Sequence, residues 1–342
     1  FVTTAGHPDI LLLREGGRTE PFDYTVPFPA PLVPRRLTFQ VAERIDAAGR
    51  ILTPLDPAGL ERLAEAVKRE RIEAVAVCLL WSIVNPVHER AVGRFLAERF
   101  PDLPVTLSHE LNPCLREYRR ASSACLDAAL KPVMTAHLAD FEARLRLEGF
   151  EGTALAVTSQ GGVVPIAAMA RAPIHALNSG PAMAPVAGRA FAAADAGSNT
   201  AVVIDTGGTT FDVSLVADGR LPATQELWIG GRYRGHITGF PSVDVSSVGA
   251  GGGSIAAVDE GGLLQVGPAS AGAVPGPACY GRGGTAATVT DAALVLGYLD
   301  PAGFLGGRMP LDPTLACAAI EPLAVALEIG IEAAAAAILE VA

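Results

Sequence analysis

The sequence predicts an α/β protein with a mainly parallel sheet, because apolar strands alternate with helices that carry clear start signals. Asp56–Pro57 and Asn85–Pro86 each combine an N-cap residue with a proline at the first helical position. Residues 74–80 form a continuous apolar run between these two helices, and a short strand is expected at 105–108. Continuous apolar strands between helices are typical of a parallel sheet covered on both faces.

The middle of the chain continues this alternation. Residues 116–149 have a helical pattern, in which Pro132 predicts a break or a new first turn. A strand is expected at 154–158, and a helix rich in small residues over 182–194. The apolar strand 201–204 then leads into the most informative segment of the chain.

That segment, residues 201–219, reads as two strands joined by a polar turn. The first strand is expected to be buried and ends at Asp205. The second strand has Phe211, Val213 and Leu215 on one face, and Asp218–Gly219 ends it as a hairpin turn. The turn between the strands reads Asp-Thr-Gly-Gly-Thr-Thr, which is a combination suited to phosphate.

The chemistry of a phosphate site explains this composition. Glycines lack Cβ, so their backbone can approach an anion and direct N–H groups at it, while threonine hydroxyls add donors. The residues that we assign to phosphate binding are Thr206, Gly207, Gly208, Thr209 and Thr210. Asp205 repels phosphate but can hold hydrated Mg²⁺, so we assign it as the catalytic, metal-binding carboxylate. A polar β-hairpin with no ligand is the alternative interpretation, and we favour phosphate binding.

Composition excludes several other classes. The chain has 342 residues and 35.1 kDa, which is enough for about two domains, and its mean hydropathy of +0.34 is too high for a disordered chain. It lacks an apolar run long enough for a membrane span. A net charge of −10 disfavours nucleic-acid binding. Neither of the two lysines, Lys68 and Lys131, follows a glycine, which excludes a Walker A loop.

The cysteines and the chain ends give two further expectations. Five cysteines without a Cys-x-x-Cys pair suit free thiols in a reducing, cytoplasmic environment better than disulfides or a zinc site. The chain starts at Phe1 and stops inside an apparent helix at 332–342, so we expect it to be the middle of a longer protein.

Two adjacent motifs resemble the ATPase superfamily of actin, hexokinase and the heat-shock-70 chaperones. Residues 205–214 are similar to its second phosphate motif, and the small-residue stretch 180–188 is similar to its first connecting helix. The resemblance implies an actin-like (ribonuclease H-like) α/β architecture that binds ATP and Mg²⁺.

Within this superfamily, the sequence resembles the hydantoinase/oxoprolinase A family over nearly its whole length. This family includes N-methylhydantoinases, 5-oxoprolinases and subunits of acetone or acetophenone carboxylases. The stretches that carry the resemblance are 1–4, 31–35, 43–46, 76–82, 85–89, 107–110, 116–120, 179–181, 247–256, 267–272, 275–281 and 288–292.

The family resemblance also implies a domain division. Residues 1–118 would be the remainder of the N-terminal domain, and residues 119–342 the ATPase domain with the second phosphate loop. The family's first phosphate loop and its downstream adenosine loop are not in this sequence. We therefore expect an architecture truncated at both ends, and a chain that is inactive by itself.

The implied function is ATP-dependent hydrolysis of a cyclic amide of the hydantoin or 5-oxoproline type, through phosphorylation of the amide oxygen. A carboxylase subunit that acts on a ketone is an alternative, and a non-enzymatic ATP-gated activase is another. The implied partner is a hydantoinase B-type second subunit or fused domain, and neither nucleic acid nor a membrane is expected.

Weaker candidates lie elsewhere in the chain. Gly251, Gly252 and Gly253 could cradle an anion or form a structural loop, and Asp244 could be a second metal carboxylate beside Asp205. Four residues around an expected strand end could bind the substrate, because the arginine fork matches planar oxygen pairs. They are His109, Glu110, Arg119 and Arg120. An ion-paired helix start is the more conservative interpretation of those four.

Three further residues have structural interpretations. We expect His236 to lie in a surface loop over 230–236, Cys279 to be a structural thiol, and Asp291 to cap a helix.

Overall fold

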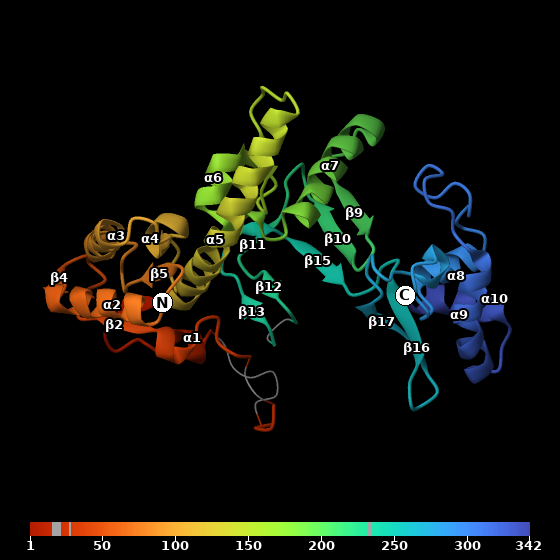
Figure 1. Ribbon diagram of the computed structural model, residues 1–342, viewed down its shortest axis with the longest axis horizontal. Coiled ribbons are helices and arrows are strands. Elements are labelled where there is room, and N and C mark those ends of the chain that lie inside the picture. Colours follow the sequence, from red (N-terminus) through yellow and green to blue (C-terminus); the bar gives the residue numbers. More distant parts are fainter. Residues whose placement is uncertain (16–21, 27–28, 232–233) are drawn as a thin grey trace. The chain divides into compact units, whose positions relative to one another are not determined.

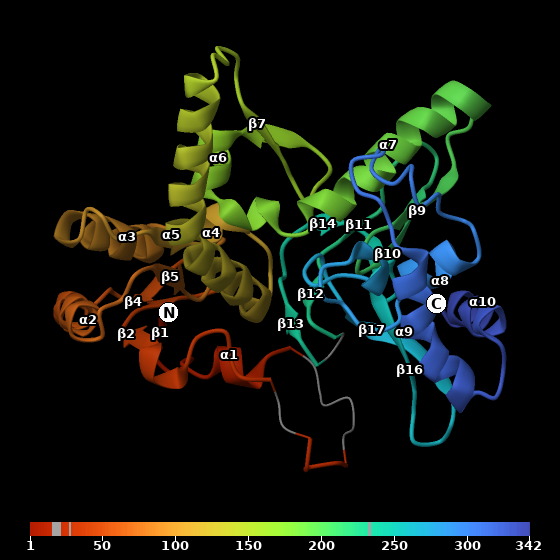
Figure 2. The same ribbon diagram turned by 45° about the vertical axis from the view of Figure 1, so that its right-hand side comes forward.

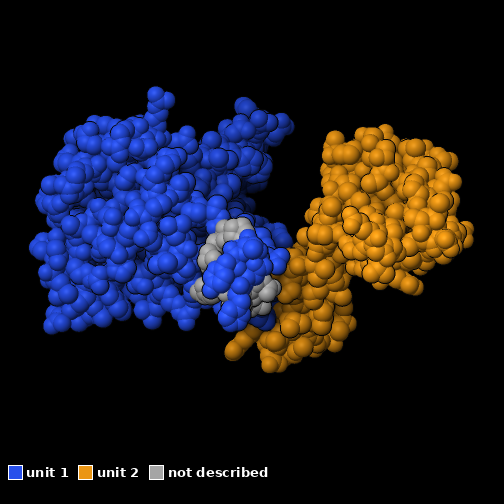
Figure 3. All heavy atoms as spheres, turned by 90° about the horizontal axis from the view of Figure 1, so that it is seen from below, with its two compact units in different colours: residues 1–186, 221–244 blue, residues 187–220, 245–342 orange. Residues whose placement is uncertain are grey.

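The computed structural model describes residues 1–15, 22–26, 29–231 and 234–342. Residues 232 and 233 of the expected surface loop lie outside the described residues. The chain forms two compact units, which Figure 3 shows in different colours. Unit 1 contains residues 1–186 and 221–244, and unit 2 contains residues 187–220 and 245–342.

The centre of unit 1 is a four-stranded parallel sheet. Its strands are β1 (Val2–Thr4), β2 (Phe39–Val41), β5 (Val75–Cys78) and β6 (Val105–Leu107), in the order β2-β1-β5-β6. Val2 lies level with Phe39 on one side and Val77 on the other. The structure thus confirms the predicted α/β class and parallel sheet.

Helices cover both faces of this sheet (Figures 1 and 2). Helices α2 (Pro57–Arg69) and α3 (Val87–Arg99) pack on one face, where Val77 and Leu79 meet apolar residues of both helices. Helix α5 (Glu117–Leu147) packs on the other face, against Ala76 and Cys78 of β5. Because every side chain of β5 is buried, its uninterrupted apolar sequence is explained.

The predicted helix start at Asp56–Pro57 is confirmed, whereas the start expected at Asn85–Pro86 lies one residue later, since Pro86 is the N-cap and Val87 the first residue of α3. The Asp56 carboxylate accepts a hydrogen bond from the Ala58 N–H at 3.0 Å, and Pro57 is the first residue of α2. The Asn85 side chain accepts from the Val87 N–H at 3.2 Å, at the start of α3. In both cases a side chain replaces the missing intrahelical acceptor.

The predicted break at Pro132 is wrong, because α5 continues through this residue to Leu147. The two halves of the helix are held by different partners. The first half packs on β5, while Leu138 in the second half packs on Ile166 and Met169 of α6 (Ile166–Arg171). This packing outweighs the hydrogen bond that proline removes. The domain boundary expected between 118 and 119 falls inside α5, and it stays a prediction.

The remaining elements of unit 1 are short. They are α1 (Ile10–Leu13), η1 (Arg35–Leu37), β3 (Arg44–Ile45), β4 (Ile51–Thr53), α4 (Ser108–Leu111), β7 (Leu155–Val157), β8 (Val163–Pro165), η2 (Pro173–Ala176), β11 (Ala223–Thr224), β12 (Trp228–Ile229), β13 (His236–Ile237) and β14 (Ser242–Val243).

Unit 2 contains a three-stranded antiparallel sheet with the order β15-β10-β9. Its strands are β9 (Ala201–Thr206), β10 (Phe211–Val216) and β15 (Val245–Val248). Helix α7 (Ser179–Ala196) crosses from unit 1 into unit 2, and its Gly188 lies against Val203 of β9. The side chains of Val202 and Ile204 are 65% and 60% exposed, so the expectation that this strand is buried is wrong. In the described structure β9 is an edge strand, and the sheet face that carries these two side chains is open.

The rest of unit 2 is a hairpin packed against three helices. Strands β16 (Ser254–Val258) and β17 (Leu264–Ser270) pair with each other. They share a core with three helices, α8 (Val289–Val295), α9 (Pro313–Ala326) and α10 (Ile331–Val341). The short helix η3 (Ala278–Tyr280) lies between β17 and α8 in the sequence. Within the described residues no single helix is long and apolar enough to cross a membrane, although the bent pair α9 and α10 passes that test by length and composition.

Candidate phosphate-binding site

The predicted phosphate loop joins β9 to β10 in unit 2 (Figure 1). Thr206 ends β9 opposite Phe211, and the Gly207 N–H donates to the Thr210 carbonyl at 2.8 Å, which closes the turn. Within the described residues, the next three N–H groups, those of Gly208, Thr209 and Thr210, have no protein acceptor. Consecutive free N–H groups in a turn form a concave site for an anion.

The glycine-rich segment 249–254 supports this loop from behind. The Gly252 N–H donates to the Gly207 carbonyl at 3.0 Å, and the Gly253 N–H donates to the Gly208 carbonyl at 2.6 Å. The Gly251 N–H donates to the Ser254 hydroxyl at 2.8 Å. These three N–H groups are therefore occupied, so the expectation that they cradle an anion themselves is corrected: those of Gly252 and Gly253 hold the carbonyls of the loop, and that of Gly251 holds the Ser254 hydroxyl.

The close approach of the segment 251–253 to the loop explains why these three residues are glycines. A Cβ on Gly251 would lie 2.8 Å from the Gly207 carbonyl oxygen, and one on Gly253 would lie 2.9 Å from the Gly208 carbonyl oxygen. The Gly252 carbonyl accepts from both the N–H and the hydroxyl of Thr290, at 2.8 and 2.7 Å. The phosphate loop is thus connected through backbone atoms to the start of helix α8.

Two carboxylates lie level with each other beside the loop. Asp205 pairs with Asp212 in the β9–β10 register, so both side chains emerge on the same face. Asp205 is exposed, whereas Asp212 is 8% exposed and its Oδ1 has no hydrogen-bond partner. Asp212 was missed by the sequence analysis, although its spacing of seven residues across the hairpin from Asp205 could have indicated it.

The predicted second carboxylate, Asp244, is assigned to a different unit from Asp205, so its role at the metal stays a prediction. It belongs to unit 1, where its N–H donates to the Pro222 carbonyl at 2.9 Å. In the sheet of unit 2, Ser247 of β15 lies opposite Asp212 of β10, which in turn lies opposite Asp205 of β9. Asp244 precedes the first residue of β15. Within the described residues no group of three or more His, Cys, Asp or Glu side chains forms a metal site.

The four predicted substrate residues do not form one open site. Arg120 is fully buried and donates to the carbonyls of Leu79 and Cys114 and to the Ser108 hydroxyl. Because these donors are used inside the protein, the expectation that Arg120 binds a substrate is corrected. Arg119 pairs with Glu15 at 2.8 Å and with Glu226 at 3.2 Å, as the ion-paired alternative expected.

His109 and Glu110 also have separate surroundings. His109 Nδ1 lies 2.9 Å from Glu89, which is fully buried, while the exposed Glu110 carboxylate lies 3.7 Å from His109 Nε2. Burial alone would raise the pKa of Glu89, but hydrogen bonds from His109 and from the Leu79 N–H outweigh it and lower that pKa. Glu89 therefore organises the buried end of strand β5.

The structure also tests the roles expected for Cys279, Asp291 and His236. Cys279 is fully buried, and burial followed by the Asp291 charge raises the pKa of its thiol, which makes it unreactive. Asp291 is the third residue of α8 rather than its cap: Thr288 is the N-cap, and the two residues form a reciprocal capping box. His236 begins strand β13 and is half-buried, which lowers its pKa.

Comparison with known proteins assigns the family. Residues 120–342 match the hydantoinase/oxoprolinase model, and residues 1–100 match that of the hydantoinase/oxoprolinase N-terminal region. The chain belongs to the hydantoinase/oxoprolinase family. This confirms the resemblance that the sequence motifs indicated.

Several characterised relatives are similar over almost the whole chain. The alpha subunit of caprolactamase from Pseudomonas jessenii is 39% identical over 335 residues, covering 96% of this chain and 47% of that protein. The gamma subunit of acetophenone carboxylase from Aromatoleum aromaticum is 36% identical, covering 97% and 46%. 5-oxoprolinase 1 from Arabidopsis thaliana is 33% identical, covering 94% and 26%.

Solved structures match in the same way. The ATP-dependent caprolactamase from Pseudomonas jessenii has a TM-score of 0.80 and 37% identity, and covers 99% of this chain. Nucleotide-free acetone carboxylase has a TM-score of 0.77 and 28% identity, with the same coverage. The chain thus has the predicted α/β fold of the actin-like ATPase type, and it spans about half the length of both structures, 49% in each case.

Proposed function

We propose that this chain supplies the nucleotide-binding part of an enzyme that uses ATP to hydrolyse a cyclic amide. The observation that carries the proposal is the row of N–H groups at Gly208, Thr209 and Thr210, which have no acceptor among the described residues, in a loop whose carbonyls are held by Gly252 and Gly253. Relatives named for ATP-dependent caprolactam and 5-oxoproline hydrolysis support the reaction class. The finer proposal is a substrate of the hydantoin or 5-oxoproline type.

The loop suits the phosphates of ATP on physical grounds. Backbone N–H groups offer partial positive charge without the desolvation cost of a buried lysine. The hydroxyls of Thr206, Thr209 and Thr210 border the same turn and can donate to further phosphate oxygens. Since the carbonyls of Gly207 and Gly208 are tied to the segment behind, the turn keeps this orientation before a nucleotide arrives.

Mg²⁺ fits the two carboxylates beside the loop. The exposed carboxylate of Asp205 and the unpartnered Oδ1 of Asp212 are the hard oxygen donors that this ion prefers, and they emerge on one sheet face. When bound, Mg²⁺ would supply charge neutralisation for the phosphate oxygens. Asp205 would hold it, and Asp212 would orient its water ligands through Oδ1.

The proposed reaction activates an unreactive amide carbon. The amide oxygen attacks the γ-phosphorus of ATP, and ADP leaves with the electrons of the broken P–O bond. Water then adds to the activated carbon, the ring nitrogen takes a proton and leaves as an amine, and a second water releases phosphate. The products are an amino acid, ADP and phosphate. The N–H groups of the loop bind and orient the transferred group.

A carboxylase subunit is the second candidate, favoured by the likeness to acetophenone carboxylase and to acetone carboxylase. There the same loop would serve phosphorylation of a ketone enolate or of bicarbonate. An ATP-gated activase is the third candidate. Because the relatives include subunits named alpha and gamma, we propose a second subunit or fused domain of the hydantoinase B type as partner.

The phosphate site is tested by Asp205→Ala in the protein that carries this chain, isolated with its partner subunit. We expect the Mg²⁺-dependent affinity for ATP, measured by calorimetry, to fall at least about tenfold, since a hydrogen bond to a charged group contributes about 1.5–3 kcal/mol. Asp195→Ala is the matched control, because Asp195 is an exposed carboxylate of α7. Equal ATP affinity for wild type and Asp205→Ala would contradict the site.

The reaction class is tested by phosphate release with a panel of small molecules. Hydantoin, 5-oxoproline and ε-caprolactam should stimulate release. The two lactams should give the ring-opened amino acid, and hydantoin should give the N-carbamoyl amino acid. Stimulation by acetophenone with bicarbonate alone would instead favour the carboxylase. Release that responds to a protein and to no small molecule would identify an activase.

A further inference from the structure

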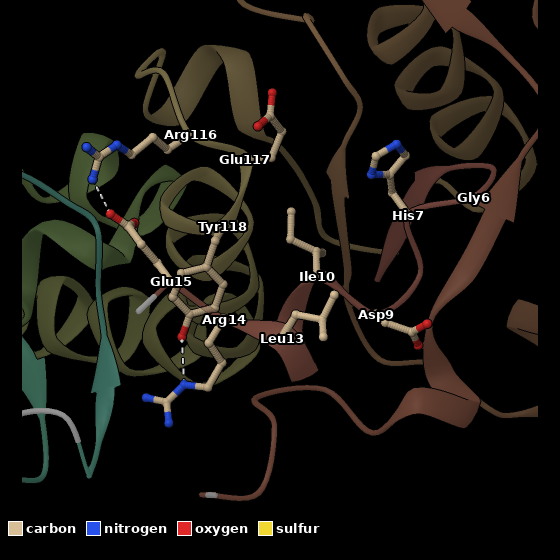
Figure 4. A pocket seen from close by; sticks show the side chains of 10 residues that line it. All are labelled: Gly6, His7, Asp9, Ile10, Leu13, Arg14, Glu15, Arg116, Glu117 and Tyr118. Carbon is tan, nitrogen blue, oxygen red and sulfur yellow. Dashed lines mark hydrogen bonds and ion pairs between the residues drawn. The ribbon is translucent and has the colours of Figure 1, made fainter. Parts of the chain in front are cut away.

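Unit 1 contains a cavity that the phosphate site does not use. It has a volume of about 480 Å³ and lies between helix α1 and the start of helix α5 (Figure 4). This size suits a small organic ligand. Ile10 and Leu13 give it an apolar surface, and in the view of Figure 4 the side chains of Glu117 and His7 lie on either side of Ile10.

Two of the three carboxylates that line the cavity are already paired. Asp9 lies 2.5 Å from the Arg35 guanidinium. Glu15 accepts hydrogen bonds from Arg116 and Arg119. Burial alone would raise the pKa of Glu15, but these two arginines outweigh it and lower that pKa, so the carboxylate stays charged and engaged. Neither group is available to a ligand without breaking an ion pair.

Glu117 and His7 do offer free hydrogen-bonding atoms. Within the described residues, the Glu117 carboxylate has no protein partner. His7 Nε2 lies 3.3 Å from Nη1 of Arg44. A guanidinium can only donate, so Nε2 must accept and the ring carries its proton on Nδ1. Among the described lining residues, the Glu117 carboxylate is thus available as an acceptor and the His7 Nδ1–H as a donor.

The backbone around the cavity is strained at two positions. Arg14 has φ 62° and ψ −163°, in a region used almost only by glycine, and Arg116 has φ 74° and ψ 103°. Arg14 is held by hydrogen bonds from its side chain to the Tyr118 hydroxyl, at 3.3 Å, and to the Gly235 carbonyl. Strain that is retained by such bonds is concentrated at ligand sites. The backbone conformations of Arg14 and Arg116 and the hydrogen bonds of Arg14 fix where α5 starts, and therefore where Glu117 lies.

We propose that this cavity binds a small neutral cyclic amide. The ring N–H would donate to the Glu117 carboxylate, the ring carbonyl would accept from His7 Nδ1–H, and the methylenes would contact Ile10 and Leu13. A lactam carries one N–H donor and one C=O acceptor, which matches the chemistry of the Glu117 carboxylate and of His7 Nδ1–H in the lining. The proposal rests on the proposed function for the class of ligand, but it assigns a site on the other unit.

The free carboxylate of Glu117 favours a neutral ligand over an acidic one. The charges of Asp9 and Glu15 are already balanced by the arginines that pair with them. In 5-oxoproline the carboxylate is on the carbon next to the ring nitrogen, so in the proposed orientation it would lie beside Glu117 and be repelled. An anionic lactam such as 5-oxoproline should therefore bind less tightly here than ε-caprolactam.

The test measures binding without ATP, in the protein that carries this chain and with any subunit that is isolated with it. ε-Caprolactam is titrated by calorimetry or by ligand-observed NMR. Glu117→Ala should weaken its binding about tenfold or more, the expected loss for a hydrogen bond to a charged acceptor. N-methyl-ε-caprolactam, which lacks the N–H, should bind wild type less tightly and should respond little to Glu117→Ala.

Glu332→Ala is the matched control, since Glu332 is also a first-turn carboxylate, in α10, and is exposed, whereas Glu117 is half-buried. It should leave lactam binding unchanged, while thermal unfolding confirms that both variants fold. Absence of lactam binding to wild type, or equal binding to Glu117→Ala, would overturn the site. If lactam binding depends on Glu117 but lactam hydrolysis does not require ATP, the proposed function fails and this site stands.

Discussion

Strand β5 of unit 1 and strand β9 of unit 2 have similar sequences and different surroundings. Both begin with four consecutive apolar residues. All four residues of β5 are buried, between α5 on one face and α2 and α3 on the other. In β9, α7 approaches one face through Gly188, whereas Val202 and Ile204 on the other face are exposed.

The difference shows what an apolar run does and does not determine. It selects an extended strand, since branched side chains pack well on a pleated surface. Whether both faces are covered depends on which helices pack on the sheet. In the described structure, unit 1 supplies helices to both faces of β5, while unit 2 leaves a face of β9 open beside the phosphate loop. Three paired substitutions test this comparison.

The largest effect is expected for Val77→Asp compared with Val202→Asp. Val77 is fully buried, so an unpaired charge there should cost more than about 4 kcal/mol of unfolding free energy or prevent folding. Val202 is 65% exposed, and the same change should cost less than about 1 kcal/mol. Urea unfolding followed by circular dichroism measures both. Similar losses for the two variants would mean that the exposed face of β9 is covered in the working protein.

The next effect compares two buried carboxylates. Glu89 accepts hydrogen bonds from the His109 N–H and ring, from the Leu79 N–H and from the Ser108 hydroxyl, so Glu89→Gln should cost about 2–4 kcal/mol. Asp212 has an Oδ1 without a partner, so Asp212→Asn should cost less than about 1 kcal/mol. Urea midpoints at neutral pH compare the two variants. A greater loss in Asp212→Asn would contradict this difference.

The pH dependence of stability gives the same comparison a second measurement. The pKa of Glu89 is lower in the folded protein than its ordinary value of 4.5, so its charge stabilises the fold above that value. This contribution is lost as the pH falls from the unfolded-state pKa through the folded-state pKa. Urea midpoints of wild type should therefore decline more steeply below about pH 4.5 than those of Glu89→Gln. Parallel curves would show that other groups dominate the acid sensitivity.

The smallest effect distinguishes two glycines of helix α7. A Cβ on Gly188 would lie 2.3 Å from a methyl carbon of Val203, so Gly188→Ala should cost about 1–3 kcal/mol by overpacking. A Cβ on Gly180 would meet no atom within 4 Å, and Gly180→Ala should gain up to about 1 kcal/mol of helix propensity. Thermal unfolding measures both variants. A gain in stability for Gly188→Ala would show that α7 does not press on β9.

Local signals in the sequence predicted much of the fold. The Asp56–Pro57 start, the parallel strands around residues 75–78 and the two-residue turn at Asp218–Gly219 all formed as expected, and the Asn85–Pro86 start was predicted to within one residue. Each depends on chemistry within a few residues of itself. The phosphate turn was located in the same way, and its role in ATP binding stays a proposal.

Features that depend on distant partners could not be predicted. Arg120 lies in a motif that suggested substrate binding, but its buried position depends on the Leu79 and Cys114 carbonyls. The helix continues through Pro132 because both of its halves pack on other elements. The glycines at 251–253 have a pattern typical of phosphate binding, yet their N–H groups donate to carbonyls of the loop and to the Ser254 hydroxyl. In each case the sequence showed the residue type, but it did not show which residues that residue would contact.

The support of the phosphate loop by Gly252 and Gly253 has a practical consequence for mutagenesis. Both contacts run from a main-chain N–H to a main-chain carbonyl, so the side chain at either end takes no part in them. Substituting Thr209 or Thr210 would leave these contacts intact and would report only on hydroxyl groups. Replacing a single amide by an ester at position 252 or 253 deletes one of them directly. Semisynthesis with such esters would therefore reveal a contribution to nucleotide affinity that conventional alanine scanning overlooks.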